Sequence, residues 1–193
     1  MKNKFKELKP KKKKIRIVLG ENEKTILLAV GVSALFLGTL AFPNLPMALQ
    51  PIIKMRGNKG FFKLLKKLRD KNVIYLGGDK VRLTPRGLKL FKIASIDQIK
   101  IDKPDKWDGL WRLVSYDVPN KYNKSRDVFR SALERLGFKK IQDSLWVFPY
   151  ECKEEIAVMA NTLGLGSYII MMMTDKLPSD KEWLREFDLE DYK

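Results

Sequence analysis

An aspartate at the end of an apolar run is the side chain of this sequence best placed to do chemistry. Asp117 follows residues 110–116, a short run rich in Leu, Val and aromatic residues that is bounded by Gly109 and Pro119. Such a run predicts a buried strand. A side chain where a strand meets a loop is often presented to ligands, but an aspartate there also caps the following turn. Both interpretations of Asp117 remain open from spacing alone.

Composition excludes several kinds of active site. The 193 residues contain no histidine and one cysteine, Cys152. Ser-His-Asp hydrolysis, histidine general-base catalysis, Cys/His zinc sites and disulfide frameworks all need residues that this sequence lacks. We therefore expect Cys152 to be a small, buried apolar residue. No cofactor is predicted from these residue types.

Positive charge is concentrated in the first half of the chain. Residues 1–92 contain 23 Lys and Arg against 5 Asp and Glu, a balance of +18 within a formal net charge of +16. Residues 93–177 have a balance of +1 and residues 178–193 a balance of −3. A basic half joined to a nearly neutral half indicates a module that binds a polyanion, with nucleic acid favoured over an anionic membrane surface.

The first 53 residues combine a basic tail with an uncharged segment. Residues 1–24 include four consecutive lysines and predict either a solvated arm or an arm that contacts phosphates without sequence preference. The apolar core of the uncharged segment, residues 25–42, falls just short of the roughly 20 residues that a spanning helix needs. We favour a buried helix and keep a membrane anchor as the alternative.

Residues 46–92 have the element order of a winged helix-turn-helix domain, which we extend back to residue 25. A short helix is predicted over 46–55, and a basic helix over 58–72 with a stripe formed by Phe61, Leu64, Leu65 and Leu68. Two short β-rich runs around Gly77-Gly78 predict a hairpin, or wing. A last helix, 85–92, follows Thr84 as its N-cap.

This reading supplies a set of candidate DNA contacts. An asparagine at the start of a recognition helix can bond adenine through two hydrogen bonds, whereas lysines mostly contact phosphate. The candidates lie on the basic helix, the wing and the start of the last helix: Asn58, Lys59, Lys63, Lys66, Lys67, Lys80, Arg82 and Arg86.

A second domain follows a predicted linker at 93–106. Apolar stripes that stop at Gly137 and Gly164 predict two helices between four strands, and the order βαββαβ over 107–177 predicts a ferredoxin-like fold. The acidic end, 178–193, predicts a C-terminal helix with Ser179 as N-cap. The predicted fold class is therefore α+β, a winged helix-turn-helix followed by a ferredoxin-like domain.

Two strings in this second domain resemble the central domain of the PaaX-type transcriptional repressors. They are Trp-Asp-Gly-Leu-Trp-Arg-Leu-Val-Ser-Tyr-Asp-Val-Pro at 107–119 and Leu-Gly-Phe-Lys-Lys-Ile-Gln-Asp-Ser-Leu-Trp-Val-Phe-Pro-Tyr at 136–150, with Arg126 between them. That family also has an N-terminal winged helix. Residues 178–193 are short for the family's C-terminal domain, so no acyl-CoA effector is implied.

The resemblance also suggests a rival activity. The PaaX central domain is similar to the small ferredoxin-like endonuclease of CRISPR spacer acquisition, where an acid at the end of the first strand is the proposed metal ligand and pairs with its twin across a dimer. Asp117 is the matching acid, so the resemblance makes it a candidate catalytic residue and Mg²⁺ ligand. One carboxylate per chain is few for Mg²⁺ catalysis.

Three functions follow from these observations. The first is a cytoplasmic, repressor-like transcriptional regulator that binds double-stranded DNA and forms a homodimer through its ferredoxin-like domain. The second is a Mg²⁺-dependent endonuclease of the CRISPR-associated type, or a related nucleic-acid-binding scaffold. The third is a DNA-binding regulator anchored in the inner membrane through residues 25–42.

Overall fold

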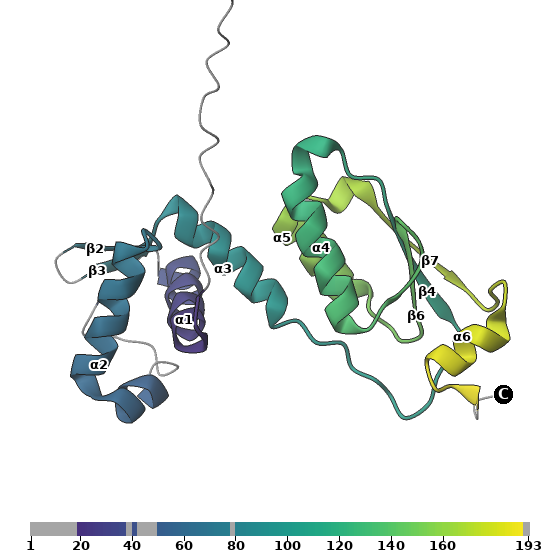
Figure 1. The fold of residues 1–193 in the computed structure, drawn as a ribbon, viewed down its shortest axis with the longest axis horizontal. Coiled ribbons are helices and arrows are strands. Elements are labelled where there is room, and N and C mark those ends of the chain that lie inside the picture. The colour runs from purple at the N-terminus through teal and green to yellow at the C-terminus, as the bar shows by residue number, and fades with distance from the viewer. Residues whose placement is uncertain (1–18, 38–39, 42–49, 78–79, 191–193) are drawn as a thin grey trace, which may run out of the picture. The chain divides into compact units, whose positions relative to one another are not determined.

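The computed structural model describes residues 19–37, 40–41, 50–77 and 80–190, and it divides the chain into two compact units (Figure 1). Unit 1 is Met1–Gly87 and unit 2 is Leu88–Lys193. Each unit contains helices and an antiparallel sheet, so the predicted α+β class is confirmed.

Unit 1 packs two helices against a small sheet. Its sheet has the strand order β1-β3-β2, and α1 contacts both α2 and β3. The buried stripe of α2 contains Phe61, Leu65 and Leu68, as predicted, while Leu64 is half-buried. The elements are α1 (Glu21–Leu37), β1 (Leu40–Ala41), α2 (Gln50–Asp70), β2 (Ile74–Gly77), β3 (Lys80–Leu83) and α3 (Pro85–Asp97), the last of which continues into unit 2.

The apolar segment differs from the single helix predicted over 25–42. The helix begins earlier, at Glu21, and ends at Leu37, after which residues 40–41 pair with β3. Ile26, Leu27 and Val30 of α1 are fully buried. No helix within the described ranges is long and apolar enough to cross a membrane. The predicted helix at 46–55 is helical from Gln50 onward, and its earlier residues lie outside the described part.

Two glycines shape unit 1. Gly57, with φ 65° and ψ 170°, divides α2 into two helical segments. The two segments correspond to the two separate helices that the sequence predicts there. Gly87 lies against Val73, whose carbonyl oxygen would be 1.9 Å from an added Cβ. Thr84 caps α3 as predicted, because its Oγ1 accepts a hydrogen bond of 2.9 Å from the Gly87 N–H.

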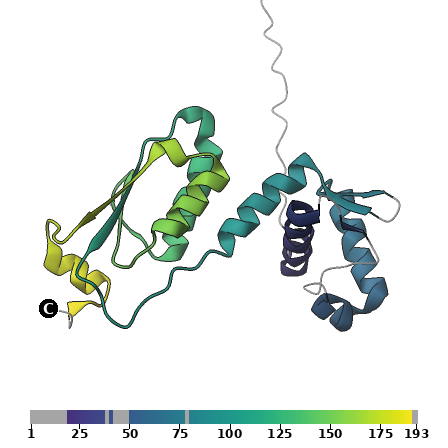
Figure 2. The same ribbon diagram turned by 180° about the vertical axis from the view of Figure 1, so that it is seen from behind.

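Unit 2 has the predicted βαββαβ order. Its four-stranded antiparallel sheet has the order β5-β6-β4-β7, in which the first and third strands of the motif lie in the centre, as in ferredoxin-like folds. The helices α4 and α5 cover one face of the sheet, and α6 lies on the other side (Figures 1 and 2). The elements are β4 (Trp111–Tyr116), α4 (Asn123–Leu136), β5 (Lys139–Gln142), β6 (Leu145–Phe148), α5 (Lys153–Leu163), β7 (Ile169–Thr174) and α6 (Asp180–Glu186).

The two faces of this sheet are packed differently. On the helix-covered face, Val114, Tyr116 and Trp146 belong to the main core with Phe129 and Leu133 of α4. On the other face a smaller core is formed by Trp111, Val147, Leu177, Leu184 and Leu189. The segment around α6 therefore covers one end of the second face. Side chains alternate between faces along each strand, which is why Trp111 and Val114, three positions apart on β4, enter different cores.

One helix boundary and one helix cap differ from the sequence prediction. α3 continues to Asp97, past the predicted end at residue 92, so the first residues of the predicted linker are helical. Ile96 is buried in the core of unit 2, and Arg135 of α4 donates hydrogen bonds to the carbonyl oxygens of Ile96 and Ile99. Ser179 precedes α6 but makes no capping side-chain hydrogen bond, because its backbone is left-handed, with φ 58°.

A buried arginine joins the start of β4 to the end of β6. The Arg112 side chain is 4% exposed, and Nη1 donates to Asp108 Oδ1 at 2.6 Å and to the carbonyl oxygens of Leu110 at 2.7 Å and Pro149 at 2.8 Å. Nη2 donates to the other carboxylate oxygen of Asp108 and, at 3.3 Å, to Glu151. The hydrogen bond from Arg112 holds the pKa of Asp108 below its ordinary value of 3.8.

We predict that Asp108→Asn destabilises the fold at neutral pH and makes it less sensitive to acid. Because the folded-state pKa of Asp108 is lowered, its stabilisation is present above pH 3.8 and is lost as the pH falls through the folded-state pKa. The half-exposed Asp108 and the remaining partners of Arg112 limit the loss at neutral pH to about 1–3 kcal/mol. Urea unfolding at neutral and acidic pH measures both effects.

The control for this prediction is Asp102→Asn, which changes an exposed aspartate of the same unit that Arg112 does not contact. Equal unfolding free energies for the Asp108 variant and the control at neutral pH would contradict the role assigned to the Asp108–Arg112 pair.

Candidate nucleic-acid interface and the Asp117 pocket

Three lysines form a stripe on the second segment of α2. Lys59, Lys63 and Lys66 are exposed and recur at intervals of four and three residues, so they lie on one helix face. That face is opposite the buried stripe containing Phe61 and Leu65, since 100° per residue puts the two sets on opposite sides of the helix. The sequence-predicted lysines are therefore brought together on an exposed surface, which we call the lysine stripe.

Lys67 lies beside the stripe and has an internal partner. Glu23 of α1 is buried, with Lys71 Nζ 2.7 Å from its Oε2 and Lys67 Nζ 3.2 Å from its Oε1. Burial raises the pKa of Glu23, but hydrogen bonds from Lys71 and the Gly20 N–H, together with the ion pair to Lys67, outweigh this, and the pKa lies below its ordinary value. Glu23 therefore stays ionised and ties α1 to α2. Sequence reasoning missed this pair, because 44 residues separate Glu23 from Lys67.

The hairpin presents an arginine beside a tyrosine. Arg82 on β3 is exposed and is directly opposite Tyr75 on β2, whose exposed fraction is 62%. Opposite residues in an antiparallel pair lie on the same face of the sheet. Tyr75 was missed in the sequence, although its alternation with the buried Ile74 is the signal of an outward side chain. Arg86 is also exposed, whereas the side chains of Asn58 and Lys80 lie outside the described part.

Asp117 follows β4 and is exposed, as the strand prediction implied. Its backbone N–H donates to the carbonyl oxygen of Tyr168 at 3.0 Å. The turn that follows begins with a 3₁₀ helix at Asn120–Tyr122, whose N-cap position is Pro119 and has no side-chain cap. The turn-capping interpretation of Asp117 is therefore not observed. Its carboxylate makes no hydrogen bond or ion pair within the ranges that the structure describes.

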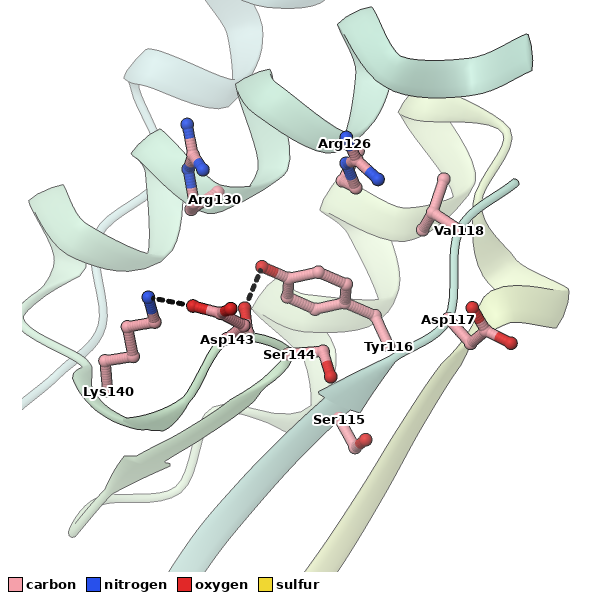
Figure 3. Close-up of a pocket in the computed structure, with 9 residues that line it drawn as sticks. All are labelled: Ser115, Tyr116, Asp117, Val118, Arg126, Arg130, Lys140, Asp143 and Ser144. Atoms are coloured by element: carbon pink, nitrogen blue, oxygen red, sulfur yellow. Dashed lines mark hydrogen bonds and ion pairs between the residues drawn. The ribbon is translucent and has the colours of Figure 1, made fainter. Parts of the chain in front are cut away.

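A surface pocket of about 480 Å³ lies next to Asp117. In Figure 3 the carboxylate of Asp117 is directed away from Arg126 and Arg130 of α4. The Nζ of Lys140 lies 2.6 Å from the Asp143 carboxylate. The hydroxyl of Tyr116 donates a hydrogen bond of 3.2 Å to the backbone carbonyl oxygen of Asp143. The pocket is lined by Ser115, Tyr116, Asp117, Val118, Arg126, Arg130, Lys140, Asp143 and Ser144.

These residues do not make a Mg²⁺ site within one chain. Among the described residues, no three His, Cys, Asp or Glu side chains come together in a way that could hold a metal ion. The other acid of the pocket, Asp143, is already paired with Lys140. Mg²⁺ prefers oxygen ligands such as carboxylates, whereas three of the five charged residues that line the pocket are cations. The donor set thus does not fit the metal that the endonuclease resemblance implies.

Cys152 is buried, as the sequence predicted. Desolvation raises the pKa of its thiol to about 12, so it is a thiol and not a thiolate at neutral pH. A nucleophilic role for Cys152 has no support from its surroundings.

The geometry of unit 2 agrees with a family comparison. Residues 104–184 match the family model described as the PaaX protein central Cas2-like domain. Residues 104–184 therefore form a domain of the PaaX central, Cas2-like type. The predicted resemblance is confirmed, and the match begins just before the Trp107–Arg112 loop and ends within α6. A search of the curated proteins finds no match to the chain.

We predict that the purified protein does not cut DNA or RNA in the presence of Mg²⁺, because Asp117 belongs to no group of side chains that could hold a metal ion among the described residues. Nuclease assays on wild type, Asp117→Ala and Asp143→Ala measure this. Cutting that requires Asp117 but not Asp143 would overturn the prediction and would favour a two-fold metal site built from two copies of Asp117.

Proposed function

We propose that this protein is a DNA-binding transcriptional regulator in which unit 1 is a winged helix-turn-helix and unit 2 forms a homodimer. The PaaX-type central domain supports a regulatory role, since the sequence resemblance is to transcriptional repressors. A regulator that binds chromosomal DNA works in the cytoplasm, which is the localisation we propose.

The element order of unit 1 supports the winged-helix proposal. α1 and β1 precede the two segments of α2, and the β2–β3 hairpin then precedes α3 (Figure 1). The bend at Gly57 is the turn between two helices, so residues 58–70 take the place of the recognition helix. β2 and β3 take the place of the wing, with β3 also paired to β1.

The lysine stripe is the observation that carries the proposal. Lys59, Lys63 and Lys66 are exposed on the face that α2 turns away from its core, and unit 1 holds most of the positive charge of the chain. A helix with such a face can enter the major groove, with its lysines on phosphates and Asn58 near base edges. Arg82, Tyr75 and Lys80 of the hairpin then contact the adjacent backbone.

We predict that Lys63→Ala combined with Lys66→Ala weakens binding to operator and random DNA alike. Each phosphate contact contributes about one unit to the slope of log affinity against log salt, so the double variant should lose about two units. Gel shifts over a range of salt concentrations measure the slope. We choose Lys66 over Lys67 because Lys67 pairs with the buried Glu23, and its removal would also affect folding.

The charge-matched control is Lys103→Ala combined with Lys181→Ala, two exposed lysines of unit 2. This control separates a local contact from a general loss of positive charge. Unchanged affinity and slope in the Lys63/Lys66 variant, or equal losses in both double variants, would show that α2 is not the DNA-binding element.

The open part of the sheet in unit 2 supports the dimer proposal. Leu113 lies between Val147 and Met172 across the sheet, and the next row places Ser115 between Leu145 and Ile170. Ile170 is 62% exposed and Met172 45% exposed, because the α6 segment covers only the other end of this face. A contiguous apolar patch of this kind marks an interface.

A second copy of unit 2 is the occupant we propose for this patch. A two-fold interface uses the same patch on both subunits, and the patch is apolar on each. The small Ser115 in its centre permits close approach of two sheets. Residues 93–177 have a balance of only +1, so two copies of this domain do not repel each other strongly.

We predict that Ile170→Lys combined with Met172→Lys converts a dimer to a monomer in sedimentation experiments at micromolar concentration. Two desolvated lysines facing their twins across a two-fold axis oppose association. The control is Val158→Lys, because Val158 is exposed on α5 and outside the patch. A wild-type monomer, or a double variant that remains dimeric, would rule out this interface.

A further inference from the structure

The pocket beside Asp117 gathers positive side chains from two elements of unit 2. Arg126 and Arg130 lie on α4, and Lys140 lies on β5 (Figure 3). The two arginines are four residues apart, so they lie on the same side of the helix about one turn from each other. They flank the buried stripe of α4 that contains Phe129 and Leu133, which positions them at the edge of the core.

The two guanidinium groups are available to a ligand. Arg130 is half-exposed, and its ion pair with Asp127 spans 3.9 Å, the longest of the ion pairs found in the described residues. Arg126 is less exposed and makes no ion pair within the described residues. Exposed pairs of this length contribute little to stability, so their cations can bind an anion at small cost.

Lys140 already holds an anion at this position. Its Nζ is 2.6 Å from the Asp143 carboxylate, and the Asp143 side chain is fully exposed. An incoming anion can replace such a carboxylate without leaving a buried charge behind. The hydroxyls of Ser115 and Ser144 also line the pocket and add neutral donors.

The lining selects the class of ligand. Three cations and two carboxylates line the pocket, but Asp117 is directed away from the arginines and Asp143 is paired with Lys140 (Figure 3). Arginine pairs recognise the tetrahedral, multiply charged phosphate group through paired N–H donors. A volume of about 480 Å³ is within the range of small-molecule pockets and exceeds what a single phosphate fills. The ligand is therefore larger than an inorganic ion and carries phosphate at the arginine end.

We propose that this pocket is a phosphate-binding site in which Arg126 and Arg130 bind the phosphate. Lys140 also binds it, and its ion pair with Asp143 is then replaced by an ion pair with the phosphate. The phosphate comes either from a free phosphorylated small molecule or from the backbone of bound nucleic acid. This inference goes beyond the proposed function, which assigns DNA binding to unit 1 alone.

The test uses inorganic pyrophosphate as the probe and amide chemical shifts as a local readout. We expect saturable shifts of the backbone amides of residues 115–118 and 140–144 in the full-length protein. In Arg126→Gln combined with Arg130→Gln, the apparent affinity should fall about tenfold or more, because two charge-assisted contacts are lost. Lys63→Gln combined with Lys66→Gln removes the same charge from unit 1 and should leave these shifts unchanged.

A second arm identifies the source of the phosphate. A short DNA duplex of random sequence is added to wild type and to both double variants. If nucleic acid supplies the phosphate, the duplex shifts the same amides, the arginine variant loses these shifts, and pyrophosphate competes with the duplex. If a small molecule supplies it, pyrophosphate alone shifts them. Either result supports the site.

Two outcomes overturn the proposal. One is the absence of shifts at these amides with both probes, and the other is an equal response in wild type and the arginine variant. Matched thermal melting of the variants excludes misfolding as the cause of a loss. DNA affinity measured on the lysine-stripe variant remains a separate test of the proposed function.

Discussion

The buried guanidinium of Arg112 is the constraint around which unit 2 is arranged. Burying a cation is costly unless its N–H groups find acceptors. The two Nη atoms of Arg112 donate to one carboxylate before β4, one after β6 and two backbone carbonyls, whereas its buried Nε has no hydrogen-bond partner among the described residues. The carbonyl of Pro149 also accepts a hydrogen bond of 2.9 Å from Trp107 Nε1. These hydrogen bonds join the start of β4 to the end of β6, the two central strands of the sheet.

The residue before Arg112 belongs to the smaller core, on the other face of the sheet. Trp111 lies beside Arg112 in sequence but points to the opposite face, where its Nε1 donates to Asp180 at 2.8 Å at the start of α6. Its ring is 4.7 Å from that of Trp107 and 5.7 Å from that of Phe187. Trp107 and Trp111 thus contribute to the core against which the α6 segment packs, while Ile170 and Met172 on β7 remain exposed.

Local patterns made most of the fold predictable, whereas contacts between distant residues did not. The strand at 111–116 and the helix ends before Gly137 and Gly164 follow from short apolar runs and left-handed glycines, which are readable within a few residues. The continuation of α3 past residue 92 was missed because Ile96 is buried by unit 2, which no local pattern reports.

The candidate sites also contain some features that local sequence patterns predict and others that depend on contacts between distant residues. Helical spacing alone predicts that Lys59, Lys63 and Lys66 lie on one helix face. The pairing of Lys67 with Glu23 and the convergence of Lys140 with Arg126 and Arg130 depend on tertiary packing. Asp117 was predicted at its strand end, but the direction of its carboxylate came only from the fold.

The buried Glu23 changes how the positive charge of α2 is distributed. Lys67 and Lys71 share its carboxylate, and Arg69 pairs with Asp70, so the charge at the end of the helix is largely compensated. Lys59, Lys63 and Lys66 make no ion pair among the described residues. The uncompensated positive charge of this segment therefore lies on the lysine stripe, and an approaching anion is attracted there more strongly than to the last turn.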